Sequence, residues 1–232
     1  MDFEQIASAI EQQSPEEALA TILSAHGAEG ACLTCSFQAE DVIALDVLRK
    51  KLPQISVLFL ETGYHFAQTY AFRDSLTKDW QLNLVNVIPE KTVAEQESEF
   101  GILNRTEPTR CCQLRKVDPL FRALEPFSLW FTGLRREQSP TRKNLKKLEL
   151  HRLPSGKPLW KVSLLADWTW GQVWQYTAAK KIAYLPLYDD GYRSIGCEPC
   201  TSVPADPNNP RAGRWGGNKL ECGIHTFSER QS

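Results

Sequence analysis

The 232-residue sequence lacks an excess of charge, a long apolar run and any internal repeat. Its 27 Lys and Arg against 28 Asp and Glu give a net charge of −1, so we expect no general attraction to nucleic acid or anionic membranes. No stretch approaches a membrane span, and Met1-Asp-Phe-Glu-Gln5 lacks the basic and apolar regions of a signal peptide. These absences predict a soluble cytoplasmic protein without nucleic-acid or membrane partners.

A disulfide framework is not expected either, because the seven cysteines are odd in number and the predicted compartment is reducing. Cys32 and Cys35 lie in an apolar run and are predicted to be buried core thiols, since free cysteine is among the most buried residue types. The other five cysteines occur in three settings: the vicinal pair Cys111-Cys112, the pair Cys197-Glu-Pro-Cys200, and Cys222 in Glu221-Cys-Gly-Ile-His225.

The two cysteine pairs, separated by a long insertion, could bind zinc or an iron–sulfur cluster. Neighbouring side chains on a helix point in different directions, so ligation by both Cys111 and Cys112 requires an unusual local geometry. Burial in the core is the alternative for this pair. The flanking Arg110, Arg115 and Lys116 weaken that alternative, because these cations would offset the negative charge of a thiolate-bound cluster.

Cys222 is the candidate nucleophile. It lies in a polar, glycine-containing segment with Arg214, Lys219 and His225 nearby, and cationic neighbours favour the attacking thiolate form. An exposed spectator cysteine is the alternative. His225 is either an orienting group for this thiol or a tail residue without a role, and the sequence does not decide between them.

Strands and helices alternate along most of the chain. Such alternation implies parallel strand pairing with helical crossovers, and so predicts an open, doubly wound α/β sheet in residues 1–200. Residues 201–232 are rich in Pro, Gly, Asn and Arg and are predicted to form a mobile tail. The basic run at 142–147 is predicted to be a solvated face or loop. The expected strands span residues 30–36, 55–60, 82–88, 128–132 and 160–164, and the expected helices include residues 15–25, about 41–51, 65–78 and 110–124.

Ligands of such sheets bind at the carboxyl ends of the strands. Ser36, at the end of the first expected strand, offers a hydroxyl and a helix N-terminus that suit a phosphate or sulfate oxyanion. In Thr132-Gly-Leu-Arg135-Arg136, Gly133 leaves a strand just before paired arginines, which allows close backbone approach and bidentate anion contacts. An ordinary helix cap and a surface turn are the respective alternatives.

Six segments, in family order over nearly the whole chain, resemble the assimilatory sulfonucleotide reductases. These enzymes reduce adenosine 5′-phosphosulfate (APS) or its 3′-phosphorylated form (PAPS). The pairing of CC with CxxC resembles the APS-preferring branch, which carries a [4Fe–4S] cluster. The matching segments are Cys35-Ser-Phe-Gln-Ala-Glu-Asp41, Phe59-Leu-Glu-Thr-Gly63, Cys111-Cys-Gln-Leu-Arg-Lys116, Trp130-Phe-Thr-Gly-Leu-Arg-Arg-Glu-Gln-Ser139, Gly191-Tyr-Arg-Ser-Ile-Gly-Cys-Glu-Pro-Cys-Thr201 and Glu221-Cys-Gly-Ile-His225.

The resemblance implies a PP-loop-like fold and thioredoxin- or glutaredoxin-dependent reduction of APS to sulfite and AMP, as part of sulfate assimilation. Cys222 would attack the sulfuryl sulfur and form an S-sulfocysteine, with Lys116 and His225 as further catalytic residues. The tail would then move so that the reductant could reach the adduct. A homo-oligomer is compatible with the sequence. The implied substrate contacts are Ser36, Gly133, Arg135, Arg211 and Arg214, and the implied cluster ligands are Cys111, Cys112, Cys197 and Cys200.

Other functions remain open at this point. A PAPS or dual-specificity reductase fits the same motifs. An ATP-pyrophosphatase-type tRNA-thiolating enzyme fits the fold, but its Ser-Gly-Gly-x-Asp-Ser loop is replaced by Ser36-Phe-Gln-Ala-Glu-Asp41, in which Phe37 and two carboxylates suit a triphosphate poorly. A non-enzymatic zinc or iron–sulfur module would explain the four paired cysteines but not Cys222. Two positions depart from the family pattern: Trp215 stands without a second tryptophan beside it, and Gln38 replaces a small residue.

Overall fold

The computed structural model describes residues 2–206, 209, 211–217, 219 and 221–225. Their strands form one sheet in the order β3-β2-β1-β4-β6-β5. Every neighbouring pair is parallel except β5 with β6. The predicted doubly wound, mostly parallel α/β sheet is therefore confirmed. The strands are β1 (Ala31–Thr34), β2 (Ser56–Leu60), β3 (Asn83–Val87), β4 (Leu129–Phe131), β5 (Leu148–Arg152) and β6 (Pro158–Val162).

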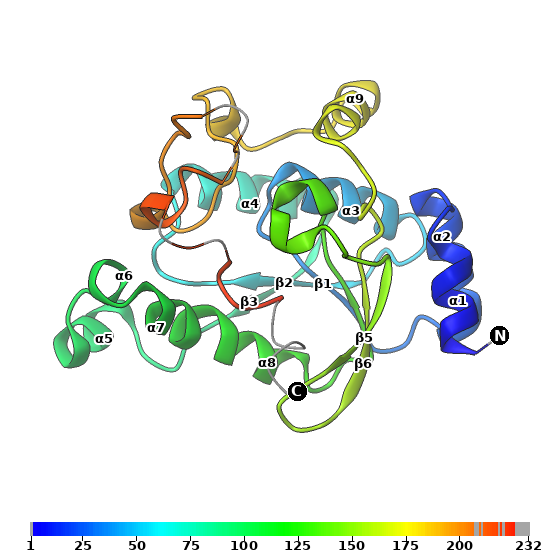
Figure 1. Ribbon diagram of the computed structural model, residues 1–232, viewed down its shortest axis with the longest axis horizontal. Helices are drawn as coiled ribbons and strands as arrows, with labels where there is room; N and C mark the ends of the chain where they lie inside the picture. The colour runs from blue at the N-terminus through cyan, green and yellow to red at the C-terminus, as the bar shows by residue number, and fades with distance from the viewer. Residues whose placement is uncertain (1, 207–208, 210, 218, 220, 226–232) are drawn as a thin grey trace.

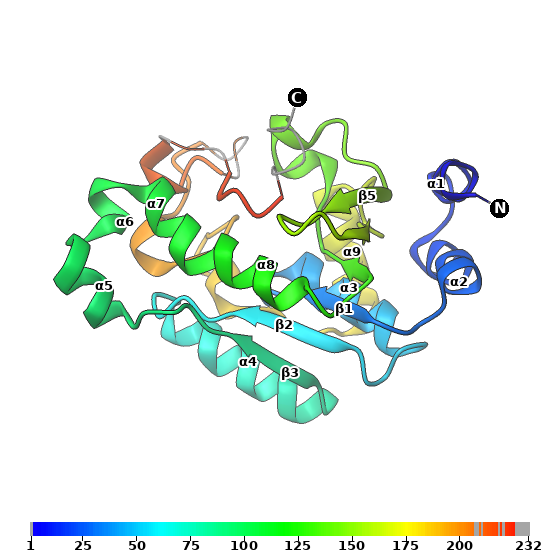
Figure 2. The same ribbon diagram turned by 90° about the horizontal axis from the view of Figure 1, so that it is seen from below.

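Helices cover both faces of this sheet, with α3 and α4 on one face and α7 and α8 on the other (Figures 1 and 2). The α-helices are α1 (Phe3–Ile10), α2 (Pro15–His26), α3 (Ala39–Arg49), α4 (Ala67–Trp80), α5 (Val93–Phe100), α6 (Leu103–Thr106), α7 (Pro108–Cys112), α8 (Asp118–Leu124) and α9 (Trp170–Lys180). A π-helical turn, η1 (Gln113–Val117), joins α7 to α8, and the short 3₁₀ turns are η2 (Arg136–Gln138), η3 (Pro140–Arg142), η4 (Pro186–Tyr188), η5 (Glu198–Cys200) and η6 (Trp215–Gly217).

Local sequence accounts for several helix starts. Asp2, Ser14, Thr92 and Thr169 each cap a helix, and each is paired with a Gln or Glu at the third helical position in a capping box. Pro15 also occupies the first position of α2, where its missing N–H has no cost. Among the helices of the described residues, none combines the length and the apolar composition needed to span a lipid bilayer.

Strand order changes direction beside β1. The chain runs from β1 through β2 to β3 at one edge, and then returns through α5–α8 to β4 on the other side of β1. Leu33 of β1 pairs in parallel with Val57 of β2 and with Phe131 of β4. The turns that follow β1 and β4 therefore flank the switch point, which is where doubly wound sheets bind ligands.

The core forms two main clusters, and each contains one of the two cysteines predicted to be buried. Cys35 is 2% exposed and lies in the cluster with α2 and α3, whereas Cys32 is 0% exposed and packs with α8 and β4. Their prediction as core thiols is confirmed. Burial raises the pKa of both thiols above its usual value, so neither is suited to act as a nucleophile.

The basic run at 142–147 continues as a loop after η3, as predicted, and Lys143 and Lys146 are exposed. Lys147 departs from the prediction: its side chain is fully buried, and its Nζ lies 2.9 Å from Asp167 Oδ2 and donates to the Gln13 carbonyl at 2.6 Å. Arg142 is also largely buried, with a side chain that is 10% exposed. A charged group can be buried where it has such partners.

Candidate active site

The turns after β1 and β4 meet at the switch point through Asp41, in the first turn of α3. Asp41 Oδ2 accepts hydrogen bonds from the backbone N and the Oγ of Ser36, at 2.7 and 2.6 Å. A Cβ built on Gly133 would lie 2.2 Å from Asp41 Oδ1 and 2.8 Å from the Asp41 backbone nitrogen. Only glycine fits at position 133, because any side chain would push β4 away from α3.

Asp41 is a buried acid, and burial raises its pKa to about 6, while the two hydrogen bonds from Ser36 oppose the shift. Phe37, within the same turn, has a φ of 60° and a fully buried side chain. Such a conformation is strained for a bulky residue and is held by the surrounding packing. The turn is thus a rigid structure in which the Ser36 hydroxyl already has a protein partner.

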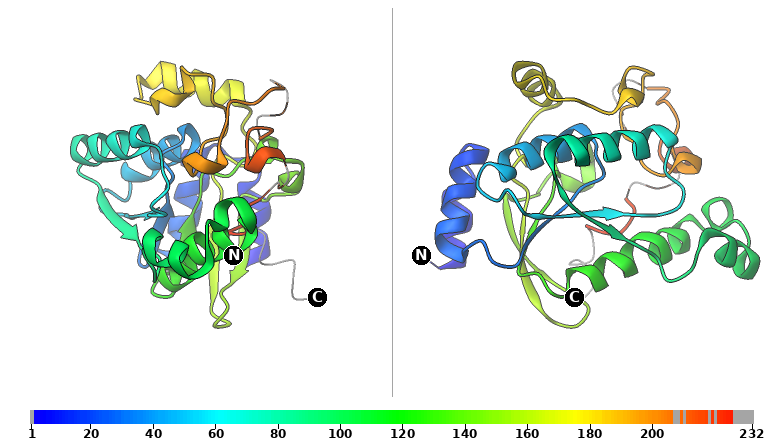
Figure 3. Two further views of the ribbon diagram at one scale, coloured as in Figure 1. Left: turned by 90° about the vertical axis from the view of Figure 1, so that its left-hand side faces the viewer. Right: turned by 180° about the vertical axis from the view of Figure 1, so that it is seen from behind.

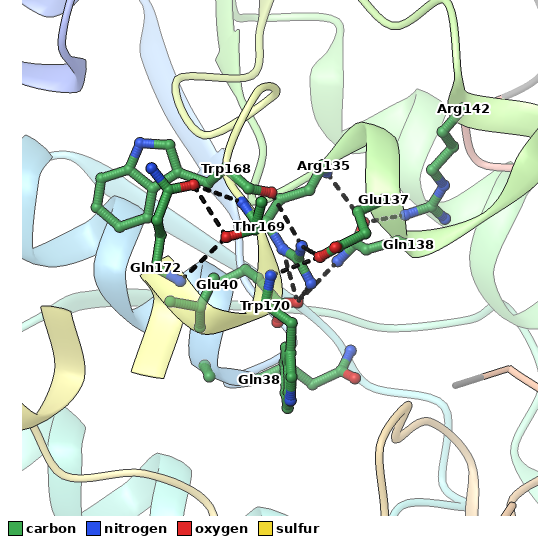
Figure 4. A network of polar contacts seen from close by, with 12 residues as sticks. Gln38, Glu40, Arg135, Glu137, Gln138, Arg142, Trp168, Thr169, Trp170 and Gln172 are labelled. Atoms are coloured by element: carbon green, nitrogen blue, oxygen red, sulfur yellow. Dashed lines mark hydrogen bonds and ion pairs between the residues drawn. The ribbon is translucent and has the colours of Figure 1, made fainter. Parts of the chain in front are cut away.

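Arg135 belongs to a buried polar network at this edge of the sheet (Figure 4). Its Nε and Nη2 donate to Glu40 Oε1 at 3.1 and 2.8 Å, and its Nη1 donates to Glu137 and to the Trp168 carbonyl, each at 3.0 Å. Arg135 and Glu40 are 3% and 5% exposed. In this arrangement Arg135 fixes the wall of the site, whereas its predicted contact with a substrate anion stays a prediction.

One cavity gathers all eight residues predicted from the sequence as substrate contacts or catalytic groups. The cavity opens at the switch point and extends toward α7–α8 and the C-terminal segment. These eight residues are Ser36, Lys116, Gly133, Arg135, Arg211, Arg214, Cys222 and His225. Residues from distant parts of the sequence therefore line one cavity, and the Lys and Arg side chains among them favour an anionic ligand.

The four paired cysteines line a second, smaller cavity beside the first. Cys111 and Cys112 lie at the end of α7, and the π-helical turn η1 follows them directly. A π turn changes the direction of side chains relative to a regular helix and is frequent at functional sites. Cys112 itself keeps α-helical dihedral angles, with φ −62° and ψ −37°, so ligation by both neighbouring cysteines stays a prediction. Cys197 and Cys200 approach from the loop around η5.

Two contacts attach the CxxC loop to the end of β2. Glu198 N donates to the Tyr64 carbonyl at 2.7 Å, and Cys197 Sγ lies 3.3 Å from Thr62 Oγ1. On the other side, the buried Arg115 donates to the Thr62 carbonyl, and to the Lys91 carbonyl and Gln96 Oε1 at 3.2 Å. These bonds attach the CxxC loop and Arg115, which follows the vicinal cysteines, to the same residue, Thr62.

The donor set fits either a zinc ion or an iron–sulfur cluster. Four thiols line one cavity, and Arg115, Lys116 and Arg214 line it with them. Thiolates are usual ligands of both groups, and adjacent cations offset the negative charge of a thiolate-bound centre. The identity of the bound group stays a prediction.

Lys116, Arg214 and Trp215 line both cavities and form the wall between them. The Arg214 guanidinium carbon lies 4.6 Å from the centroid of the Trp215 ring. Burial would lower the pKa of Lys116, but the thiol groups of Cys197, Cys222 and Cys112 outweigh burial and raise it. The positive charge of Lys116 therefore acts electrostatically on both cavities, the small one lined by the four cysteines and the large one lined by Cys222.

His225 lines the same cavity as Cys222, and its ring stacks on Trp130 at 5.7 Å between centroids and an interplanar angle of 18°. Burial, followed by Lys161 and Arg142, lowers its pKa well below the usual value. The imidazole is therefore neutral at physiological pH. Among the residues described, its Nδ1 has no hydrogen-bond partner. This placement favours an anchoring role for His225, and its catalytic role remains a prediction.

Most of the predicted mobile tail that the structure describes is packed against the body. Arg214 and Trp215 are buried, and Thr201 forms a bridge with Arg214. Cys222 is half-buried and lines the large cavity. Positions 207–208, 210, 218, 220 and 226–232 lie outside the described residues. Mobility of the tail during turnover stays a prediction.

Several cavity residues were missed by the sequence analysis. Arg142 was assigned to a solvated run, yet it lines the cavity and forms an ion pair with Glu221. Trp170 and Arg193 lie on the opposite wall, with Arg193 at 6.0 Å from the Trp170 ring centroid. The sequence could have indicated Arg142 through its position, because it lies seven residues after Arg135 in the segment that follows the end of β4.

Comparison with known proteins agrees with this geometry. A profile of the phosphoadenosine phosphosulfate reductase domain matches residues 30–203. The phosphoadenosine 5′-phosphosulfate reductase of Gloeobacter violaceus is 42% identical over 228 residues, which cover 96% of this chain and 93% of that protein. The adenosine 5′-phosphosulfate reductase of Mycolicibacterium smegmatis is 43% identical, over 80% of this chain and 78% of its own.

Solved structures show the same architecture. The phosphoadenylyl-sulfate reductase of Candida auris, in a phosphate complex, aligns with a TM-score of 0.72 at 25% identity, over 85% of this chain and 96% of its own. A Candida glabrata FMN adenylyltransferase aligns with a TM-score of 0.58 at 13% identity, over 87% of this chain and 73% of its own. The second likeness concerns the fold alone.

Proposed function

Because the chain belongs to the phosphoadenosine phosphosulfate reductase domain family, we propose that it reduces adenosine 5′-phosphosulfate to sulfite and AMP in sulfate assimilation. The observation that carries the proposal is the single cavity that brings Cys222 together with Lys116, Arg211 and Arg214. A thiol nucleophile and several cations around one space suit attack on an anionic sulfuryl group.

The nucleotide binds at the switch point between β1 and β4. The absence of a side chain at Gly133 lets β4 approach Asp41 closely, and Asp41 in turn fixes the Ser36 turn that forms one wall of the cavity. The phosphosulfate extends toward Lys116 and the two arginines of the C-terminal segment. Arg135 holds this wall through Glu40, so it supports binding through position as well as charge.

In the first chemical step, the Cys222 thiolate attacks the sulfuryl sulfur. A sulfur–sulfur bond forms, the bond from sulfur to the bridging oxygen breaks, and AMP leaves with that electron pair. The enzyme then carries S-sulfocysteine. Lys116 stabilises the negative charge that develops on the sulfuryl oxygens, because it lines the same cavity as Cys222.

In the second step, a dithiol reductant such as thioredoxin or glutaredoxin attacks the Cys222 sulfur and sulfite leaves. Its second thiol resolves the mixed disulfide, so the reductant becomes a disulfide and Cys222 regains its thiol. The reductant must reach this sulfur directly. We therefore propose that the segment from residue 201 leaves the cavity between the two steps, as a mobile element of the cycle.

Cys111, Cys112, Cys197 and Cys200 are proposed to hold a [4Fe–4S] cluster, which when bound supplies a fixed electrostatic influence beside the substrate site rather than the reducing electrons. Lys116 lies between the two cavities. Lys116 is therefore placed to orient the sulfuryl group in the large cavity while it faces the four cysteines of the small cavity and the charge that they carry. Cytoplasmic placement completes the proposal, because thiols stay reduced there.

A PAPS or dual-specificity reductase is the second candidate. The G. violaceus relative, named a phosphoadenosine 5′-phosphosulfate reductase, is 42% identical over 96% of this chain. The relatives named adenosine 5′-phosphosulfate reductases, such as those of M. smegmatis and Bacillus subtilis, are 40–43% identical. Identity alone does not separate the two substrates, whereas the paired cysteines favour APS.

Sulfite release tests the proposed function. The reduced protein is mixed with APS and reduced thioredoxin, or with APS and reduced glutaredoxin, and sulfite is measured over time. We expect release that depends on the dithiol and is abolished by Cys222→Ser. The Cys32→Ala variant is the matched control, because Cys32 is a buried core thiol that does not line the cavity, and it should retain activity where it folds. Undiminished sulfite release by Cys222→Ser would reject the proposed role of Cys222.

A further inference from the structure

Glu221, the residue before the nucleophile, is held by a forked ion pair with Arg142. Arg142 Nε donates to Glu221 Oε1 at 2.9 Å, and Arg142 Nη2 donates to Oε2 at 2.7 Å. Both side chains are almost inaccessible, with exposed fractions of 10% for Arg142 and 9% for Glu221. Such planar, bidentate pairs fix orientation as well as distance.

Neighbouring groups complete this arrangement. Thr141 Oγ1 donates to Glu221 Oε1 at 2.9 Å. Arg142 Nη1 donates to Gln138 Oε1, and the Gln138 amide reaches Glu40 at 3.1 Å. The carboxylate of Glu221 is thus connected through Arg142 to the buried network of Arg135 and Glu40. Figure 4 shows the part of this network from Arg142 through Gln138 to Glu40.

The two partners come from distant parts of the chain. Arg142 ends η3, on the body of the protein, whereas Glu221 lies in the C-terminal segment next to Cys222. Three residues beyond Cys222, His225 stacks on Trp130. The nucleophile is therefore placed between an ionic anchor on one side and an aromatic anchor on the other. Figure 3 shows this C-terminal segment running back over the body of the molecule.

We propose that the Glu221–Arg142 pair is a latch that positions the Cys222 thiolate for attack and must open before the reductant can reach the sulfur. This inference rests on the proposed function. Glu221 and Arg142 are then positioning residues, which act through Cys222 rather than on the substrate. The nearby Arg211, 3.6 Å from Glu221 Oε2, links the latch to the substrate site.

A buried position is what allows the pair to act as a latch. Exposed ion pairs contribute little because water and salt compete with them. Neutralising Glu221 leaves the buried Arg142 without its carboxylate partner, and neutralising Arg142 leaves Glu221 with the more distant Arg211 at 3.6 Å. Either loss is unfavourable while the segment stays docked. A neutral side chain at either position should therefore shift the segment toward the undocked state, in which the unpaired group can reach water.

Two rates that change in opposite directions distinguish a latch from general damage to the thiol. In Glu221→Gln and Arg142→Gln, modification of Cys222 by a bulky maleimide, followed by mass spectrometry of its peptide, should become faster by about tenfold or more, as expected for loss of a charged hydrogen bond. Formation of S-sulfocysteine from APS should become slower by a similar factor. A thiol that had only lost reactivity would slow both reactions.

The double variant Glu221→Gln/Arg142→Gln tests whether the two residues act as a pair. We expect its rates to resemble those of the more affected single variant, because the second change removes an interaction that is already lost. Multiplication of the two single effects would overturn the latch. The control pair is Arg122 and Glu90, which also form an ion pair but are 49% and 76% exposed, and Glu90→Gln should change neither rate.

The maleimide measurement needs no substrate, so it separates the latch from the proposed reaction. Faster modification without any S-sulfocysteine in the unaltered protein would support the latch as a docking device and reject the proposed function. Unchanged modification in both single variants, with circular dichroism matching the unaltered protein, would overturn the latch while leaving the function intact. Should Arg142→Gln fail to fold, Thr141→Val removes only the 2.9 Å hydroxyl bond to Glu221 and is expected to change both rates in the same directions by a smaller factor.

Discussion

The guanidinium of Arg214 lies against the backbone of Gly196, the residue before the first cysteine of the CxxC pair. A Cβ built on Gly196 would come within 2.2 Å of Arg214 Nη2 and 2.5 Å of Nη1. The glycine therefore makes room for the cation at the wall shared by the two cavities. This contact links the cysteine-bearing loop directly to an arginine proposed to bind the phosphosulfate.

Gly196→Ala should displace Arg214 with little effect on folding, because the atom in conflict is the far end of a flexible side chain. We expect the KM for APS to rise by about tenfold, as for the loss of one charged hydrogen bond. Steady-state kinetics and urea unfolding measure the two effects. The control is Gly171→Ala in α9, where the new Cβ meets nothing closer than 3.8 Å and should stabilise the helix by about 0.5 kcal/mol or more. A KM that stays unchanged in Gly196→Ala would contradict the placement of Arg214 at the substrate.

Lys116→Ala tests the cation between the two cavities. Removing a fixed positive charge from the site of developing negative charge should lower kcat by about 10²-fold or more, with iron and sulfide contents unchanged. Lys91→Ala is the matched control, since Lys91 pairs with Glu99 on the exposed surface. Unchanged turnover in Lys116→Ala with an intact cluster would reject the proposed role of Lys116.

Much of the fold was predictable because its parallel strands are buried apolar runs. The segments leading to Ser36 and Leu60 were placed to within about two residues, as is usual for element boundaries. The strand Leu148–Arg152 was not found, because it is a half-exposed edge strand that follows a basic run. Its pairing with β6 is antiparallel, which no alternation of strands and helices predicts.

Site residues could be predicted where they belong to a short sequence motif. They could not be predicted where they form ion pairs with residues far away in the sequence. Cys222 and the cysteine pairs are visible from spacing. By contrast, Arg142 and Glu221 are 79 residues apart, and neither is distinctive alone. The network around Arg135 is similar, because its partner Glu40 is 95 residues away. The ion pair of Arg135 with Glu40 is one that no local motif indicates, while its predicted contact with a substrate anion stays a prediction.

His151 predicts part of the acid sensitivity of the protein. It is 2% exposed, between Phe121 and Trp130, and burial, reinforced by Lys161, lowers its pKa from 6.5 to about 4. A lowered pKa in the folded state means that the unfolded chain binds the proton more readily. The contribution of neutral His151 to the free energy of unfolding is therefore fully present above pH 6.5, and it is lost as the pH falls toward 4.

The variant His151→Phe isolates this contribution. It should lose less stability between pH 7 and pH 4 than the unaltered protein, by about 3 kcal/mol at most, from the size of the pKa shift. Urea unfolding at a series of pH values measures the difference. Parallel stability curves for the two proteins would show that His151 does not carry this proton linkage.

Substrate preference is tested by sulfite formation from APS and PAPS at matched, subsaturating concentrations with the same reductant. We expect a higher kcat/KM for APS, since the CC and CxxC pairs are typical of the APS-preferring branch. Arg122, which is 49% exposed on α8 and does not line the cavity, is the control position, and Arg122→Gln should leave turnover of both substrates nearly unchanged. Equal rates with the two substrates would overturn APS selectivity and leave the reductase chemistry intact.

The most direct test of the account is the covalent state of Cys222 after one turnover without reductant. Reduced protein is incubated with APS, quenched, and examined by peptide mass spectrometry, while AMP is measured in the same sample. The account predicts one added SO₃ group on the peptide containing Cys222, with one AMP released for each adduct, and loss of both in Cys222→Ser. AMP and sulfite formation in the absence of a dithiol, with Cys222 unmodified throughout, would contradict it.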